Sequence, residues 1–296
     1  MARVLIFSDV HGNLEALDAV LDHARTFARP DQVWCLGDLV GYGPDPGACI
    51  DRVRNGFDGV PITCILGNHD DGVIQLRLGQ SIAESSGVSA SIFESWQWTA
   101  KTITRDQFAY LQSLPRKYVV NHLPQPVLLV HAAPPDDIES YLLTVRAVEG
   151  RLSDFKERLC CFGHTHLPSY FECSRTTLEI RPRLFSASSQ RKRLLGESIL
   201  INPGSVGQPR WGELSDGSMA APNSDQRVQP YPRELRGVPK ATYIWLEFDG
   251  EEISATCHYI DYNTTATVNK LKALRTAPKP FDTPQRWLNR LTTGLR

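Results

Sequence analysis

The stretch Asp9-Val10-His11-Gly12-Asn13 follows the apolar run Val4-Leu5-Ile6-Phe7 and precedes a helical pattern. An aspartate and a histidine two residues apart in an extended chain point to the same side. Asp9 and His11 would do so just past the end of a buried strand, where open α/β sheets place their sites. Taken alone, the stretch leaves a metal site and an ordinary turn as open alternatives.

The composition is that of an ordinary globular protein: 41% of the 296 residues are hydrophobic, 22% are charged, and the formal net charge is -1. A charge this close to zero gives no sign of a dedicated nucleic-acid binder or a membrane-surface protein. The N-terminus leads directly into a strand without a signal-peptide pattern, and no apolar run approaches the roughly 18 residues that span a bilayer. The sequence therefore predicts a soluble, cytoplasmic protein.

The first third of the chain alternates strands and helices with short connections. Strands are expected at residues 3–8, 32–36 and 61–66, and helices at 13–28 and 47–54. This alternation is typical of βαβ units, whose parallel strands put their C-terminal ends on one edge of a sheet.

The rest of the chain is expected to be helical over residues 72–114 and then mostly β. Strands are expected at 117–121, 126–130, 158–162, 169–173, 177–181 and 198–201, with a hairpin at 242–248 and 253–260. Residues 207–240 are rich in Pro, Gly and Ser and are expected to form a long flexible loop, either a lid or a passive insertion. With C-terminal helices at about 265–291 and no internal repeat, the pattern predicts a single domain over residues 1–296.

Five of the expected strands end in residue types that bind metals. These residues are Asp9 and His11, Asp38, Asn68 and His69, His131, and His164 and His166. One such strand end is ordinary, but five together are not expected of solvated turns. Mixed imidazole and carboxylate ligands suit Mn, Fe, Zn or Co and suit Mg or Ca poorly. Because the candidates exceed the ligand set of one ion, the sequence predicts two metals bridged by one carboxylate, an arrangement built for displacement at phosphorus.

In this order, the motifs resemble those of the calcineurin-like metallophosphoesterases. The family pattern of D-x-H, G-D-x-x, G-N-H-[DE], a single H and G-H-x-H is matched by Asp9-Val10-His11, Gly37-Asp38-Leu39-Val40, Gly67-Asn68-His69-Asp70, His131-Ala132-Ala133 and Gly163-His164-Thr165-His166. The resemblance covers about residues 1–206 and the later hairpin. It implies an α+β fold of four αββα layers, in which a central β-sandwich flanked by helices carries the site at its strand ends.

The resemblance also implies a role for each residue. The first metal would be held by Asp9, His11 and His166, the second by Asn68, His131 and His164, and Asp38 would bridge the two. The metals would be two divalent ions among Mn, Fe, Zn, Ni and Co, with Mn favoured, and a metal-bridging hydroxide would attack the phosphorus. His69 matches the family histidine that binds no metal and donates a proton to the leaving oxygen. Whether Asp70 or Asp38 orients His69 is left open.

Departures from the family's branches narrow the choice of substrate. The Ser/Thr protein phosphatase branch carries arginines in G-D-x-V-D-R-G and R-G-N-H-E, where this chain has Tyr42 and Leu66. Their absence argues against a typical protein phosphatase and against the symmetrically cleaving dinucleotide hydrolases of that branch. Residues 41–44 and 202–210 are instead similar to the small bacterial phosphodiesterase branch, some of whose members cleave nucleotides or dinucleoside polyphosphates.

Substrate contacts are expected outside the metal motifs. Tyr42 and Arg210 are candidate substrate-binding residues, the first by stacking on a base and the second by binding a phosphate. The basic cluster Arg191-Lys192-Arg193 is interpreted as solvated loop charge, and Trp96 and Trp98 are interpreted as packing residues.

The sequence thus predicts a dinuclear metal-dependent phosphoesterase that hydrolyses phosphodiester or nucleotide-type substrates, with no membrane partner. A phosphomonoesterase, including an atypical Ser/Thr protein phosphatase, is the first alternative. A non-catalytic metal-binding scaffold is the second, although such a scaffold would be expected to lose metal ligands. The sequence leaves open the natural substrate, the preference between monoesters and diesters, the physiological metal and the oligomeric state.

Overall fold

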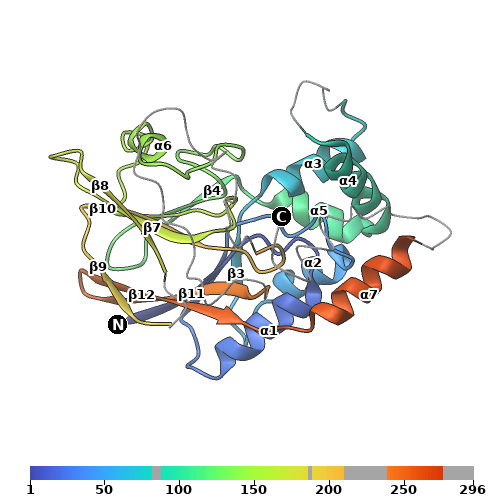
Figure 1. Cartoon of the computed structure of the whole chain (residues 1–296), viewed down its shortest axis with the longest axis horizontal. Coiled ribbons are helices and arrows are strands. Elements are labelled where there is room, and N and C mark those ends of the chain that lie inside the picture. Colours follow the sequence, from blue (N-terminus) through green and yellow to red (C-terminus); the bar gives the residue numbers. More distant parts are fainter. Residues whose placement is uncertain (82–87, 186–188, 210–238, 276–296) are drawn as a thin grey trace.

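The computed structural model describes residues 1–81, 88–185, 189–209 and 239–275, and its strands form two six-stranded sheets (Figure 1). In order across it, the first sheet contains β3 (Ile62–Cys64), β2 (Gln32–Cys35), β1 (Ala2–Phe7), β11 (Ala241–Asp249), β12 (Glu252–Ile260) and β9 (Lys192–Leu194). The second sheet contains β4 (Lys117–Val120), β5 (Val127–Val130), β6 (Leu159–Cys161), β10 (Ser198–Pro203), β7 (Pro168–Cys173) and β8 (Ile180–Leu184).

Both sheets mix parallel and antiparallel pairs. In the first sheet β1, β2 and β3 are parallel, but β11 lies antiparallel beside β1. In the second sheet β5, β6 and β10 are parallel, while β4 and β7 run antiparallel to their neighbours β5 and β10. The βαβ pattern read from the sequence therefore describes only the first three strands, because β11 returns from far along the chain and closes the parallel block.

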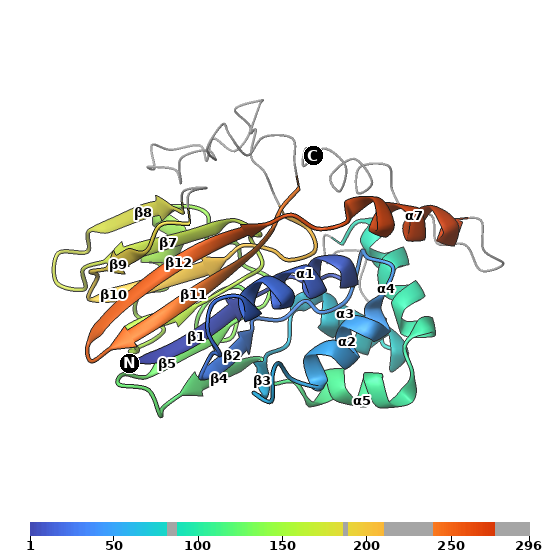
Figure 2. The same cartoon turned by 90° about the horizontal axis from the view of Figure 1, so that it is seen from below.

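Helices cover the outer faces of the two sheets (Figure 2). On the side of the first sheet lie α1 (Leu14–Arg25), α2 (Pro46–Arg54), α3 (Asn68–Arg77), α4 (Ala90–Thr102), α5 (Arg105–Ser113) and α7 (Thr264–Arg275). On the side of the second sheet lies α6 (Val145–Glu149), which Figure 1 shows beside β8. α1 contacts β11 and β12, and α6 contacts β8. These layers confirm the α+β sandwich flanked by helices that the sequence predicts.

The apolar sequence of β1 follows from burial on both faces of its sheet. Val4 and Ile6 belong to the core between the sheets, whereas Leu5 and Phe7 belong to the core under the helices. Alternate side chains of a strand point to opposite faces, so a strand covered on both sides must be apolar throughout. All four side chains are at most 1% exposed. This burial fixes the position of β1 in the sandwich and, with it, the position of Asp9 just past the end of the strand.

The basic stretch at residues 191–193 lies at a sheet edge. β9 pairs with β12 as the last strand of the first sheet, and charged side chains are a common protection of such edges. Arg191 lies 2.9 Å from a carboxylate oxygen of Glu247, and Arg193 forms an ion pair with Glu252. Lys192 and Arg193 therefore lie on an edge strand rather than in the expected loop, whereas Arg191 precedes the strand. The strand could not be predicted because consecutive basic residues hide the alternation of apolar and polar side chains.

The third strand of the first sheet is shorter than expected. The predicted strand at 61–66 ends at Cys64, and Asn68 and His69 are the first two residues of α3. A helix start places its first side chains beside the preceding strand end, so both residues still reach the edge where the strands end.

Parts of the predicted C-terminal half fall outside the described residues. α7 matches the first of the helices expected at about 265–291, while a second one near 284–291, most of the loop at 207–240 and Arg210 lie outside. The single domain over residues 1–296 therefore stays a prediction. Within the described part of the chain, no helix has both the length and the apolar character needed to cross a membrane.

Candidate metal centre

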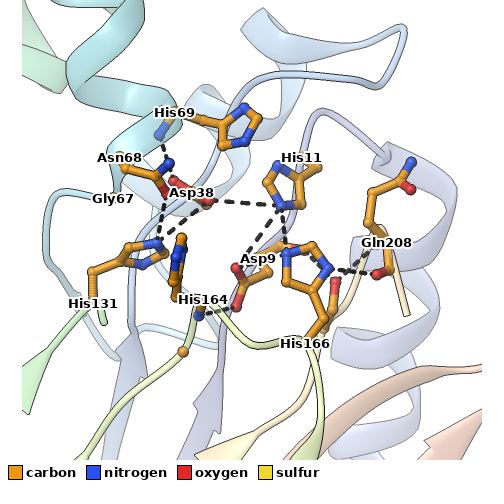
Figure 3. A network of polar contacts seen from close by, with 12 residues as sticks. Asp9, His11, Asp38, Gly67, Asn68, His69, His131, His164, His166 and Gln208 are labelled. Atoms are coloured by element: carbon orange, nitrogen blue, oxygen red, sulfur yellow. Dashed lines mark hydrogen bonds and ion pairs between the residues drawn. The ribbon is translucent and has the colours of Figure 1, made fainter. Parts of the chain in front are cut away.

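The ends of strands from both sheets meet at one end of the sandwich (Figure 3). Asp9 and His11 follow β1, Asp38 follows β2, Asn68 and His69 begin α3 after β3, His131 follows β5, and His164 and His166 follow β6. The structure thus brings together every residue that the sequence singles out as a metal ligand or proton donor. All of these side chains are buried except that of Asn68, which is partly exposed.

The backbone at five of these residues is left-handed rather than extended. Asp9, His11, Asp38, His164 and His166 have φ angles between 49° and 62°. Residues other than glycine rarely adopt this conformation, which costs about 1–3 kcal/mol each and concentrates at functional sites. The expectation that Asp9 and His11 meet because the chain is extended is therefore wrong: a turn at each residue aims both side chains at the site.

Hydrogen bonds between the loops hold this strained backbone in place. The N–H of His11 donates to the carbonyl of Asp38 at 2.9 Å. The N–H of His164 donates to Oδ2 of Asp9 at 3.1 Å, and the N–H of His69 donates to Oδ1 of Asp38 at 2.8 Å. One oxygen of each carboxylate is thereby fixed, and the other is turned into the site.

These second oxygens, Oδ1 of Asp9 and Oδ2 of Asp38, are buried and find no hydrogen-bond donor among the described residues. Oδ1 of Asp9 lies 3.2 Å from Nε2 of His166. Oδ2 of Asp38 lies 3.6 Å from Nε2 of His11 and 3.4 Å from Nε2 of His131. A buried carboxylate oxygen without a donor is costly unless a cation neutralises it. The geometry at both oxygens therefore fits a bound cation.

Four of the five histidines are anchored in the same way. One ring nitrogen of each faces a backbone carbonyl: Nδ1 of His11 (Val40, 3.2 Å), of His131 (Leu36, 2.7 Å) and of His166 (Gln208, 2.6 Å), and Nε2 of His164 (Glu139, 3.1 Å). A carbonyl only accepts, so this nitrogen carries a proton, and in a neutral ring the other nitrogen presents a lone pair. This is the state in which histidine binds a metal. These carbonyls could not be predicted from the sequence, because every residue has a backbone carbonyl.

The histidines nearest to each other show why a cation fits between them. Nε2 of His11 lies 3.1 Å from Nε2 of His166, and each ring is anchored through its Nδ1. Two lone pairs at this distance repel each other unless a proton or a metal lies between them. The pair therefore belongs to a site for a positive charge.

The ligand atoms fall into three groups, in each of which all atoms lie within 4.8 Å of one another. The groups are Asp9, His11 and His166; Asp38, His131 and His164; and His11, Asp38 and His69. Imidazole with carboxylate is the donor set of first-row transition metals rather than of Mg or Ca. The first two groups match the ligands predicted for the two metals, and the third adds His69, which the sequence predicts to be a non-ligand.

The charges of the site are centred on His131 and Asp38. Burial disfavours the charged form of His131, but the Asp38 carboxylate outweighs burial and raises the pKa of His131 to about 10. Burial in turn raises the pKa of Asp38, but His131 and His69 hold this pKa well below its usual range. The protonated Nε2 of His131 donates to Oδ1 of Asn68 at 3.1 Å. Asn68 and Asp38 thus both lie next to the proton on Nε2 of His131, and all three residues are predicted ligands of the second metal.

His69 differs from the other four histidines. The indole N–H of Trp96 donates to Nδ1 of His69 at 2.9 Å, and burial lowers the pKa of His69 to about 4. The carboxylate of Asp70 accepts from two backbone N–H groups, both at 3.1 Å, and Asp38 accepts from the backbone N–H of His69 itself. Among the described residues no hydrogen bond joins either carboxylate to the His69 ring, and the contact to the ring comes from Trp96 instead.

A cavity of about 250 Å³ opens beside the clustered residues. Its lining includes the apolar side chains of Val88 and Ile92 as well as Glu139 and Tyr141. Tyr141 is 46% exposed, and its ring lies against that of His164 with centroids 4.1 Å apart. The sequence missed Tyr141, because it lies in a stretch without periodicity or motif.

Tyr42, a predicted substrate contact, also lines this cavity, but it is only 8% exposed. Its ring centroid lies 4.7 Å from that of His11 and 4.5 Å from that of His69. The ring also packs with Val268 and Leu271 of α7. Tyr42 therefore joins the C-terminal helix to the site, and substrate contact by this residue stays a prediction.

Comparisons with known proteins agree with this geometry. A family model described as calcineurin-like phosphoesterase matches residues 2–168. The chain is 32% identical to an uncharacterized protein of Methanocaldococcus jannaschii over 71% of this chain and 79% of that protein. It is 30% identical to a symmetrical bis(5'-nucleosyl)-tetraphosphatase of Glaesserella parasuis over 50% of this chain, and the match spans about half (51%) of that enzyme.

A solved structure extends the likeness to the whole chain. The metallophosphoesterase from Sphaerobacter thermophilus has a TM-score of 0.72 and 29% sequence identity, covering 99% of each chain. The family model spans the motifs of Asp9, Asp38, His131 and His164, the same residues that the fold gathers at its strand ends. The chain therefore belongs to the calcineurin-like phosphoesterase family and is a hydrolase of phosphoesters.

Proposed function

We propose that the protein is a two-metal phosphoesterase that hydrolyses phosphodiester or nucleotide-type substrates. The observation that carries this proposal is the position of Oδ2 of Asp38, which lies 3.6 Å from Nε2 of His11 and 3.4 Å from Nε2 of His131. One carboxylate oxygen that serves two histidine groups is the arrangement expected of a bridging ligand. Asp9, His11 and His166 would complete one site, and Asn68, His131 and His164 the other, with Mn the favoured ion.

When bound, the two cations would polarise phosphoryl oxygens and lower the pKa of a shared water so that it attacks as hydroxide. Asp38 and Asp9 supply the negative charge that holds the cations, and the left-handed turns keep these carboxylates aimed before substrate arrives. His69 lines the cavity and would donate a hydrogen bond from its Nε2–H to the leaving oxygen.

A nucleotide-type substrate is supported by the cavity and by the relatives. Val88, Ile92 and Tyr141 offer apolar and aromatic surface next to the metal ligands, which suits a substrate with a flat ring beside its phosphate. One relative, which the chain matches over about half (51%) of that protein's length, is named a symmetrical bis(5'-nucleosyl)-tetraphosphatase. Because Tyr42 and Leu66 stand where the symmetrically cleaving enzymes have arginines, this chain is still expected to bind phosphate differently from those enzymes.

A substrate panel on the Mn-loaded protein tests this proposal. We expect turnover of bis(4-nitrophenyl) phosphate and of dinucleoside polyphosphates that exceeds turnover of 4-nitrophenyl phosphate and of phosphopeptides. Higher turnover of the monoester or of phosphopeptides would favour the alternative of a phosphomonoesterase or atypical Ser/Thr protein phosphatase. No turnover of any substrate, with no bound metal by elemental analysis, would contradict the proposed function, whereas bound metal without turnover would favour the non-catalytic metal-binding scaffold.

Metal affinity is expected to rise with pH because loading must displace the proton of His131. The pKa of His131 is raised to about 10, so this ring is protonated at neutral pH, and a metal needs its Nε2 lone pair. The apparent affinity for Mn or Zn should increase by up to about tenfold per pH unit until the pH approaches the pKa of His131, about 10, and level off above it. Competition titrations at several pH values measure this slope, and calorimetry in two buffers counts the released proton. A slope of zero would show that His131 is not displaced.

A further inference from the structure

The hydrogen bond to Nδ1 of His69 has the opposite direction from those of its neighbours. The other four histidines each donate a hydrogen bond to a backbone carbonyl: His11, His131, His164 and His166. His69 instead accepts at Nδ1 from the indole N–H of Trp96, at 2.9 Å. An indole N–H is a donor only, so Nδ1 must hold a lone pair and the proton of the neutral ring must sit on Nε2.

This tautomer decides what His69 can do. Its nearest ligand atom lies within 4.8 Å of those of His11 and Asp38, close enough for His69 to take part in metal binding. With Nδ1 engaged by the indole and Nε2 protonated, however, the ring has no lone pair to offer a metal. Because His69 also lines the cavity, the same Nε2–H is available to an oxygen of a substrate.

We infer that Trp96 is a positioning residue, which keeps His69 off the metals and presents its Nε2–H to the leaving oxygen of the substrate. This inference rests on the proposed phosphoesterase function. It adds that Trp96 decides whether His69 binds a metal or donates a hydrogen bond to the substrate. Sequence alone interprets Trp96 as a packing residue.

The packing around Trp96 shows that the indole is held for this contact. Trp96 is 4% exposed, and its ring stands at 90° to that of His69 with centroids 5.4 Å apart. A Cβ at Gly72 of α3 would lie 2.5 Å from the indole, so the ring packs directly on the backbone of that helix. A Cβ at Gly41, where φ is +86°, would lie 2.4 Å from Nδ1 of His69. The site thus has room at Nδ1 for the indole and not for a side chain from residue 41.

The contact can be removed with little change of shape. Incorporation of β-(3-benzothienyl)alanine at position 96 replaces the indole N–H by sulfur, and Trp96→Phe provides a simpler second variant. We expect kcat for a nucleoside or alkyl leaving group to fall by about 10–100-fold, KM to change by less than about twofold, and the loss to be smaller for nitrophenyl leaving groups. Trp98→Phe, on the same helix, is the matched control and should retain wild-type kcat.

The tautomer itself gives a readout that does not depend on activity. In ¹⁵N-histidine NMR spectra of the metal-free and zinc-loaded protein, we expect His69 to show a protonated Nε2 and an acceptor Nδ1, with the signals assigned by their loss in His69→Gln. The benzothienyl protein should show a substantial population of the Nδ1-protonated form. A wild-type His69 protonated at Nδ1, or a benzothienyl protein with unchanged spectrum and kcat, would overturn the inference.

The two proposals fail in different ways. If the wild-type protein hydrolyses no phosphoester, the proposed function is wrong, and the NMR experiment still decides whether Trp96 sets the tautomer. If the wild-type protein is active and the benzothienyl protein matches it in kcat, only the role of Trp96 is wrong.

Discussion

Asp38→Asn is expected to abolish metal loading and turnover together. Asparagine keeps the side-chain oxygen that accepts from the N–H of His69 at 2.8 Å, so the loop should remain in place. It removes the negative charge at Oδ2, the oxygen that faces both His11 and His131. Losing this charge at both cations should lower kcat/KM by at least about 10⁴-fold, which corresponds to about 5.4 kcal/mol of transition-state stabilisation.

Elemental analysis after loading and desalting, together with steady-state kinetics on a phosphodiester, measures both effects. Asp71→Asn is the matched control, because Asp71 lies nearby on α3 and forms an ion pair with Arg116 at 3.3 Å. This control should keep its metal content and turnover. An Asp38→Asn protein that retains two equivalents of metal would show that another group bridges the ions.

The location of the site could be predicted because polar ligand types stand directly after apolar strands. Asp38 and His131 each follow a run of buried residues, and parallel strands with buried ends carry such residues to one edge. The prediction that Asp9 and His11 face the same site is correct, but the extended chain assumed for it is not the cause. Asp9 and His11 meet through left-handed turns, and nothing in the types Asp and His announces a positive φ.

Contacts between distant segments account for what the sequence could not predict. The backbone carbonyl of Gln208 anchors His166 from 42 residues away. A backbone group is common to all residues, so the sequence does not mark it as a partner of His166. Trp96 is 27 residues from His69, and an indole in a helix is most often a packing residue. Strand β11 pairs with β1 in the interior of the first sheet although more than 230 residues separate them along the chain. Periodicity reports local structure, and each of these contacts depends on the complete fold.

His69→Ala is expected to keep both metals and to lose most of the turnover. His69 contributes a donor to the cavity, but the carbonyl-anchored histidines and both carboxylates lie on other segments and should still hold the cations. Loss of a fixed hydrogen-bond donor to the charge that develops on the leaving oxygen typically costs about 10²–10³-fold in rate. The loss should be greatest for nucleoside or alkyl leaving groups, because a nitrophenolate leaves without protonation.

Kinetics over a series of diesters with leaving groups of different pKa, combined with elemental analysis, tests this prediction. The dependence of log kcat on leaving-group pKa should become steeper in His69→Ala, since the enzyme no longer neutralises the developing charge. His122→Ala, which changes an exposed histidine away from the site, should leave both the slope and the metal content unchanged. If His69→Ala also empties one metal site, then His69 is a ligand, and the third group of close ligand atoms, with His11 and Asp38, describes its true role.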